Sequence, residues 1–277
     1  MRTKTLRSVS LEVVAILVAL VVFVVPFVFM FLTASKDEFE SADLKFSLPT
    51  DWAVVDNIKE AFAARDGMLL TAFKNSTILT VVSVAILVVL CSMVGYVIQR
   101  RPGRVANLAN ILVISGLIIP PAVVPTIWVL QQMHLFKTLP GLILVEVAYQ
   151  MAFCVLLFRA FVAAIPRELD EAAMIDGCTG LNLFFRVIFP LLRPVTITVI
   201  LTSSVFIYSD FVNPLYFLPG DENATVQLTL FNFLSQFSTQ YNLLFMDIVL
   251  VTLPPLVLFI FFNRKIVAGM TSGAVKG

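Results

Sequence analysis

Charged residues, cysteine and histidine are all scarce in this chain of 277 residues. Only 13% of the residues are charged, against about 25% in a typical soluble domain, and 59% are hydrophobic. The single histidine, His134, excludes a metal site built from several histidines, and three cysteines, two of them in apolar runs, exclude a disulfide framework. A net charge of +1 provides no basic surface for nucleic acid. We therefore expect neither a metal site nor a nucleic-acid partner.

Long apolar runs account for the mean hydropathy of +0.97 and indicate an integral membrane protein. A bilayer core of about 30 Å requires roughly 20 predominantly apolar residues in each helix that crosses it. The predicted fold class is all-α, a polytopic membrane protein with six transmembrane helices in a single domain, 1–277. The six predicted spans lie at about 11–32, 76–98, 107–131, 139–162, 195–218 and 243–263.

Lysine and arginine indicate how these spans are oriented. With the N-terminus in the cytoplasm, 13 of the 19 basic residues fall in cytoplasmic segments, as the positive-inside rule requires. Both termini are then cytoplasmic. Two segments are too long for simple turns: an acidic extracytoplasmic loop at 33–73, with a short helix expected at 56–64, and a cytoplasmic loop at 163–194.

The cytoplasmic loop carries helix signals of its own. Pro166 suits a first helical position, acidic residues follow it, and Gly177 suits a left-handed stop. A second short helix is predicted from an N-cap at Thr179 to Phe189, where Pro190 ends it. Two short helices joined at a glycine would protrude from the membrane, which favours docking to another protein.

The residues of this loop resemble a known family motif. Glu171-Ala172-Ala173, then Gly177, then Val187-Ile188-Phe189-Pro190 are similar to the EAA loop of binding-protein-dependent ABC importers. That pattern is E-A-A, three residues, G, nine residues, I-x-L-P. The stretch 165–194 resembles the carbohydrate-uptake permeases of the maltose type in particular. Without the motif, a helix pair that only bridges two spans would explain the loop equally well.

The resemblance implies a permease subunit of an ATP-driven sugar or oligosaccharide importer in a prokaryotic cell membrane (inner or plasma membrane). The first loop helix would couple the path to a separate ATPase. Expected partners are a second homologous permease subunit, two ATP-binding cassette subunits and an extracytoplasmic solute-binding protein that docks partly on the 33–73 loop. The implied coupling residues are Glu171, Ala172, Ala173, Asp176, Gly177 and Pro190.

Cofactor binding is expected on the partner alone. A phosphate loop requires G-x-x-x-x-G-K-[ST], and the sequence holds no Gly-Lys dipeptide. ATP and Mg would therefore bind to the partner ATPase, and this chain would bind no cofactor and would not be an enzyme.

Carboxyl groups inside the apolar runs indicate an interior path. Glu146, Asp210 and Asp247 fall in these runs, and an acidic residue at the centre of a spanning helix costs roughly 2.5 to 3.5 kcal/mol. The span at 195–218 is therefore expected to line the interior. In a sugar path, carboxylates and amides would bond hydroxyl groups, and aromatic rings would stack on pyranose faces. The residues expected to do so are Tyr149, Gln150, Tyr208, Asp210, Asn213 and Tyr216.

Two features of the path leave alternatives open. Polar groups inside a membrane also hold helices together, and for Glu146 and Gln150 this interpretation is as good as the path. Pro120, Pro121 and Pro125 interrupt the run at 107–131, either as a gate or as a static packing kink.

Two other functions are compatible with a polytopic membrane protein. An ion-coupled secondary transporter with Asp210 as the carrier is the alternative, but it leaves the EAA-like loop unexplained, and no convincing repeat relates 1–138 to 139–277. An intramembrane enzyme would need a nucleophile, a base or a metal site inside the bilayer. No predicted span holds a histidine, and no acidic residues cluster at ligand spacing. No catalytic residues are therefore expected.

Overall fold

The computed structural model describes residues 2–234 and 239–274, and the regular elements in these two stretches are all helices. The predicted all-α class is therefore confirmed. The predicted domain over 1–277 also contains residues 1, 235–238 and 275–277, which lie outside the described part. The long helices are α1 (Arg2–Ala34), α3 (Val54–Arg100), α6 (Leu139–Ala164) and α13 (Tyr241–Ala274).

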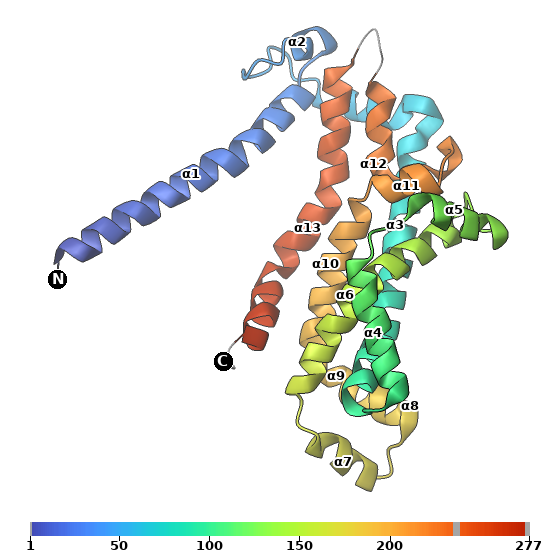
Figure 1. Ribbon diagram of the computed structural model, residues 1–277. Helices are drawn as coiled ribbons and strands as arrows, with labels where there is room; N and C mark the ends of the chain where they lie inside the picture. Colours follow the sequence, from blue (N-terminus) through green and yellow to red (C-terminus); the bar gives the residue numbers. More distant parts are fainter. Residues whose placement is uncertain (1, 235–238, 275–277) are drawn as a thin grey trace. The chain divides into compact units, whose positions relative to one another are not determined.

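Short helices fill the connections between the long ones (Figure 1). They are α2 (Glu38–Ala42), α4 (Arg104–Ile118), α5 (Val123–Gln132), α7 (Glu168–Ile175), α8 (Gly180–Leu183), a π-helix (Phe184–Ile188), α9 (Phe189–Leu191), α10 (Arg193–Tyr208), α11 (Val212–Phe217), a 3-10 helix (Asp221–Asn223), α12 (Val226–Thr229) and a second 3-10 helix (Leu230–Phe233).

Within the described residues, four helical segments are long and apolar enough to cross a membrane. They are Leu11–Ala34, Val54–Arg100, Leu139–Ala164 and Tyr241–Phe262. The stretches Gly180–Leu191 and Arg193–Tyr208 would add a fifth if they form one span bent by 78°. The chain is thus a polytopic membrane protein. Continuous helices number fewer than the predicted six spans because two of those spans are broken.

The predicted span at 107–131 is divided between α4 and α5. Ile119, which follows α4, has an extended backbone (ψ 120°), as a residue before proline prefers. Neither Pro120 nor Pro121 can donate a helical hydrogen bond, so the helix stops instead of bending. Pro125 is tolerated because it lies in the first turn of α5, where N–H groups have no intrahelical partner.

The predicted span at 195–218 is divided between α10 and α11. Pro214 cannot donate to the carbonyl of Asp210, and its ring would collide with that carbonyl in a continuous helix. The Asp210 side chain caps the new helix instead, because its Oδ1 accepts from the backbone N–H of Val212 at 2.9 Å and of Asn213 at 3.5 Å.

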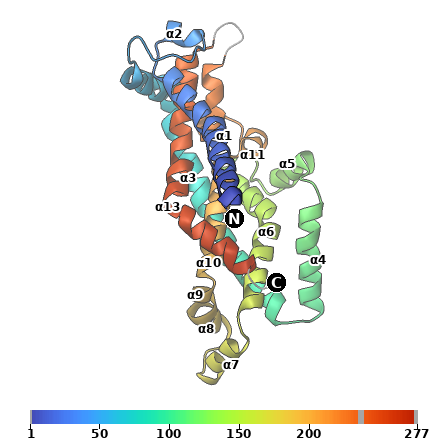
Figure 2. The ribbon, with the colours of Figure 1, turned by 90° about the vertical axis from the view of Figure 1, so that its left-hand side faces the viewer.

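The chain forms two compact units: one contains the residues up to Leu70 together with Thr229–Leu253, and the other contains Thr71–Leu228 with the chain from Pro254 onward. The core of the second unit is made of apolar side chains from the later turns of α3, from α6, and from the segment 184–218. Within it, α4 lies beside α6 (Figure 1 and Figure 2).

Gly95 allows α3 and α6 to pack closely in this second unit. A Cβ atom at Gly95 would lie 2.9 Å from the backbone nitrogen of Arg159 and 3.0 Å from the Cβ of Phe158. Helix association in membranes depends on van der Waals packing. Small residues at the contact let the two backbones approach closely and so increase this packing.

The first unit contains residues 33–70 of the predicted loop at 33–73, and these residues are folded. The side-chain amide of Asn57 donates to the carbonyls of Ala34 and Lys36, both at 2.8 Å, and its Oδ1 accepts from the Asn242 amide at 3.0 Å. The buried Lys36 ammonium donates to the Lys45 carbonyl and the Ser47 hydroxyl, both at 2.9 Å. A helix is present over the expected 56–64, at the start of α3, whose helical dihedrals are interrupted at 64–67.

Candidate functional site

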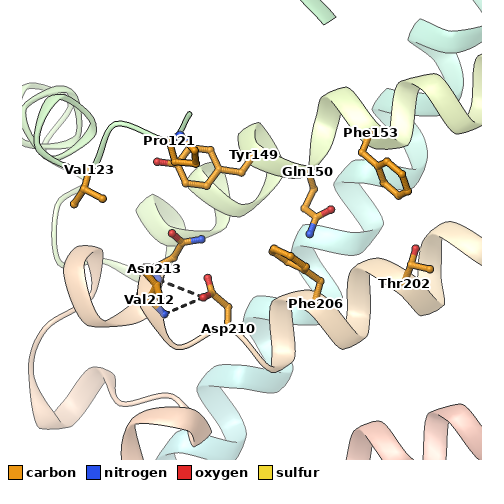
Figure 3. A pocket seen from close by; sticks show the side chains of 10 residues that line it. All are labelled: Pro121, Val123, Tyr149, Gln150, Phe153, Thr202, Phe206, Asp210, Val212 and Asn213. Atoms are coloured by element: carbon orange, nitrogen blue, oxygen red, sulfur yellow. Dashed lines mark hydrogen bonds between the residues drawn. The ribbon is translucent and has the colours of Figure 1, made fainter. Parts of the chain in front are cut away.

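The second unit contains a cavity of about 640 Å³ beside α6 and α10 (Figure 3). Its wall is made from one face of each of these helices and from both helix breaks, between α4 and α5 and between α10 and α11. The lining is mostly apolar with a few polar groups, which is the composition of a small-molecule site. The lining residues are Pro121, Val123, Tyr149, Gln150, Phe153, Thr202, Phe206, Asp210, Val212 and Asn213.

Four of the six residues expected on a sugar path lie in this lining: Tyr149, Gln150, Asp210 and Asn213. Tyr208 does not, because the last turn of α10 directs it into the core, where it is 7% exposed. Tyr216 does not either, and it is 48% exposed.

Asp210 and Glu146 are joined through Asn213. The Asn213 side-chain amide donates to Glu146 Oε1 at 3.1 Å, and its backbone N–H points to Asp210 Oδ1. Glu146 is fully buried and is not a lining residue. Among the described residues, Glu146 Oε2 and Asp210 Oδ2 have no hydrogen-bond partner. Asp210 therefore stabilises α11 with Oδ1, while its Oδ2 is buried near the Glu146 carboxyl group.

Several lining residues were missed from the sequence because they resemble ordinary span residues. Thr202 and Phe206 precede Asp210 by eight and four positions on α10, and Phe153 follows Tyr149 by four on α6. Residues four apart share one face of a helix, so this spacing was the signal that could have found them. In Figure 3 the side chains of Gln150 and Phe206 extend toward each other from the two helices.

The loop predicted to be cytoplasmic, 163–194, contains the short helix α7 followed by a glycine stop, at the end of the second unit far from α5 and α11 (Figure 1). Helix α7 ends at Ile175, and Gly177 takes the predicted left-handed conformation with a φ of 85°. The N–H of Cys178 then bonds the carbonyl of Ala173 at 2.9 Å, which satisfies the end of the helix. The turn therefore depends on the backbone dihedral of the glycine.

The residues of the EAA-like motif differ in exposure. Glu171, Ala172 and Asp176 are exposed, whereas Ala173 is buried against the rest of the loop. Asp176 lies just after α7 and donates its backbone N–H to the carbonyl of Ala172 at 3.0 Å. Ile175 is 86% exposed. An apolar side chain at the tip of a short helix, next to exposed acidic residues, forms a surface that a protein partner could cover.

The prediction that Pro190 ends the second loop helix was wrong. The helical path continues through the π-helix and α9 to Leu191, and it turns by 78° at Leu192. The backbone N–H of Phe189 bonds the carbonyl of Phe184, five residues back. This wider turn displaces the regular bonding pattern just before Pro190, so a residue without an N–H can follow without ending the helix.

Comparison with known proteins places these features in context. Residues 88–272 match the family described as "Binding-protein-dependent transport system inner membrane component". The melibiose/raffinose/stachyose import permease protein MelC of Bacillus subtilis (strain 168) is 32% identical over 279 residues, covering 100% of this chain and 99% of that protein. The probable starch degradation products transport system permease protein AmyC of Thermoanaerobacterium thermosulfurigenes is 30% identical over 91% of each chain.

Solved structures share the fold. A chain of a bacterial ABC transporter involved in the import of the acidic polysaccharide alginate superposes with a TM-score of 0.83 and 16% identity, covering 95% of this chain and 98% of that one. A second, from a bacterial alginate ABC transporter in complex with an alginate pentasaccharide-bound periplasmic protein, has a TM-score of 0.70 and 14% identity, with coverage of 95% and 94%. At these identities the likeness concerns the fold alone.

Proposed function

The chain belongs to the family of binding-protein-dependent transport system inner membrane components, and from this we propose that it is a permease subunit of an ATP-driven importer of sugars or oligosaccharides. The observation that carries the proposal is the likeness to MelC along the whole of both chains, since that permease is named for the import of melibiose, raffinose and stachyose. A permease performs no chemistry itself, so the cavity needs binding groups and no nucleophile.

The proposed topology has six spans with both termini in the cytoplasm, counting α4 with α5 and α10 with α11 as two broken spans. The basic residues of the cytoplasmic segments support this orientation. Non-helical backbone at membrane depth is tolerated where it lines a cavity, and both breaks do so here. The segment 33–73 is then extracytoplasmic and offers part of the docking surface for a solute-binding protein.

In this proposal α7 is the coupling helix, and the cytoplasmic coupling loop is 163–194. Glu171, Asp176 and the exposed Ile175 would contact an ATP-binding cassette subunit, which binds ATP and Mg. Gly177 would shape the turn behind that surface. Closure of two such subunits on ATP would displace the coupling helix and open the cavity to the other side of the membrane, in alternating access with a second, homologous permease subunit.

The cavity would form half of the path for the sugar. Asp210 and Asn213 would offer polar groups to the sugar, and Tyr149, Phe153 and Phe206 would offer aromatic faces. The ion-coupled alternative is not supported, because the family match accounts for the EAA-like loop. In addition, Asp210 has a structural use as the cap of α11.

The experiment that tests the function is purification of the tagged chain in mild detergent, followed by mass spectrometry and reconstitution. We expect an ATP-binding cassette protein and a second permease to co-purify, and we expect proteoliposomes with the binding protein to take up sugar only with ATP. A chain that purifies alone as a homo-oligomer, and that transports without ATP, would refute the proposal.

A further inference from the structure

Arg100, the last residue of α3, contacts the cytoplasmic loop at two points. Its Nε lies 2.7 Å from Asp170 Oδ2, and its Nη2 donates to the carbonyl of Ile165 at 2.7 Å. The two charged side chains are only 8% and 9% exposed. The sequence indicated Arg100 only as one basic residue among several at the cytoplasmic side, and the ion pair is visible only in the folded chain.

One of the two contacts lies in the short connection between α6 and α7, and the other lies just beyond it on α7. Helix α6 ends at Ala164, Ile165 is extended (ψ 127°), and Pro166 follows before α7 begins at Glu168. An extended residue and a proline carry no helical hydrogen bonds across this connection, so the chain alone would let α7 pivot relative to α6. Arg100 bonds the connection itself through Ile165 and α7 through Asp170.

The same end of α3 also contacts the second half of the loop and α6. The ring of Tyr96 packs on Phe184 of the π-helix, with 5.5 Å between the ring centroids. Arg159 of α6 donates from Nε to Gln99 Oε1 at 3.3 Å and from Nη1 to Asn110 Oδ1 of α4. Helix α4 continues to the break that lines the cavity. Helix α3 thus contacts both halves of the loop and the helices that lead to the cavity.

We propose that the Arg100–Asp170 ion pair is the positioning contact through which the coupling helix α7 moves α3, so that ATP-driven displacement of the loop reaches the cavity. This inference rests on the proposed function. Asp170 is buried, whereas Glu171, next to it, is exposed. The two adjacent acidic residues therefore have different roles. Glu171 contacts the ATPase, and Asp170 transmits the movement of α7 to the membrane helices.

The test uses the whole complex, reconstituted with its binding protein, and measures sugar uptake and ATP hydrolysis together. We expect Arg100→Gln and Asp170→Asn to retain ATP hydrolysis while uptake falls at least about tenfold, so that more ATP is consumed per sugar. Asp170→Arg combined with Arg100→Asp should recover part of the uptake, as expected for a pair that acts together. Arg101→Gln, an exposed neighbour, is the matched control and should resemble the wild type.

Arg100→Lys keeps the test decisive if the neutral variants do not assemble. A lysine retains the charge but has one donor group, which cannot bond Asp170 and the Ile165 carbonyl with the geometry of a guanidinium. We expect its consumption of ATP per sugar to rise about threefold, between the wild type and Arg100→Gln. A wild-type ratio in Arg100→Lys and in the assembled neutral variants would overturn the inference.

Equal losses of ATP hydrolysis and of uptake would also overturn it, since they would show a role in assembly alone. Wild-type proteoliposomes that take up no sugar with ATP would refute the proposed function itself, and with it this inference. A coupled wild type is therefore the reference against which the ion pair is judged.

Discussion

The Gly177 turn depends on a single backbone dihedral, since a Cβ atom there would meet no heavy atom within 4 Å. A β-branched residue in this left-handed conformation is disfavoured by roughly 1 to 2 kcal/mol. We expect Gly177→Val to insert normally, as judged by membrane abundance, and to lose uptake. Gly177→Asn, whose side chain tolerates the conformation, should retain most of it. Normal transport by Gly177→Val would refute the assignment of α7 as the coupling helix.

Asp210 combines a capping role with a proposed sugar contact, and two substitutions separate these roles. Asp210→Asn retains a capping oxygen and removes the charge, whereas Asp210→Ala removes both. Because a hydrogen bond to a charged group contributes about 1.5 to 3 kcal/mol, we expect Asp210→Asn to lower uptake by about tenfold or more without changing thermal stability. Asp210→Ala should lower both. Unchanged uptake in Asp210→Asn would show that Asp210 only holds α11 in place.

Two tyrosines give a matched test of which residues line the path. Tyr149 lies in the cavity and Tyr216 does not, although the sequence placed both there. An aromatic contact contributes about 0.5 to 1.5 kcal/mol, so Tyr149→Ala should lower the uptake rate by about two- to tenfold at limiting sugar. Tyr216→Ala should leave the rate unchanged. The reverse ranking in a transport assay would contradict the assignment of this cavity as the path.

At the scale of the elements, the close packing of α3 on α6 depends on Gly95. Overpacking a tight contact costs about 1 to 3 kcal/mol, and here the obstacle is the backbone nitrogen of Arg159, which cannot rotate away. We expect Gly95→Val to lower the melting temperature of the detergent-solubilised protein by several degrees. Gly116→Ala, whose added Cβ would lie 3.4 Å from the Cβ of Ala152, is the control and should be near neutral.

Hydropathy predicted the long spans well and the broken spans poorly. The runs at 139–162 and 243–263 fall within the continuous helices α6 and α13. The run at 107–131 carried a visible proline signal, but composition does not distinguish a bent helix from one that stops at Ile119. Pro254 and Pro255 lie inside α13 without ending it, which shows that proline alone does not decide the outcome.

The polar residues of the cavity could be predicted to the extent that their chemistry identifies them. Polar groups in apolar runs led to Asp210, Asn213, Tyr149 and Gln150, all of which line the cavity. Tyr208 lies outside the cavity lining because its direction follows from the packing of α10, which residue type does not encode. The Arg100–Asp170 pair was missed because its partners are 70 positions apart and meet only through the tertiary fold.

At the scale of the whole molecule, α1 has an apolar surface that the rest of the chain does not cover. Residues 11–28 of this helix are all exposed and almost entirely apolar. In a membrane such a surface contacts lipid or another helix, and the proposed second permease subunit is one candidate for it.

The hydrogen bonds of Asn57 have a consequence for recognition outside the membrane. They connect the end of α1, the loop after it and the start of α13, so the surface that the proposed topology places outside the membrane is already ordered in the unbound chain. A surface ordered in advance loses little conformational entropy on association, and little of the binding free energy is then offset. The proposed solute-binding protein would dock on a preordered surface. Discrimination between its sugar-bound and sugar-free forms would then depend on the shape of the solute-binding protein.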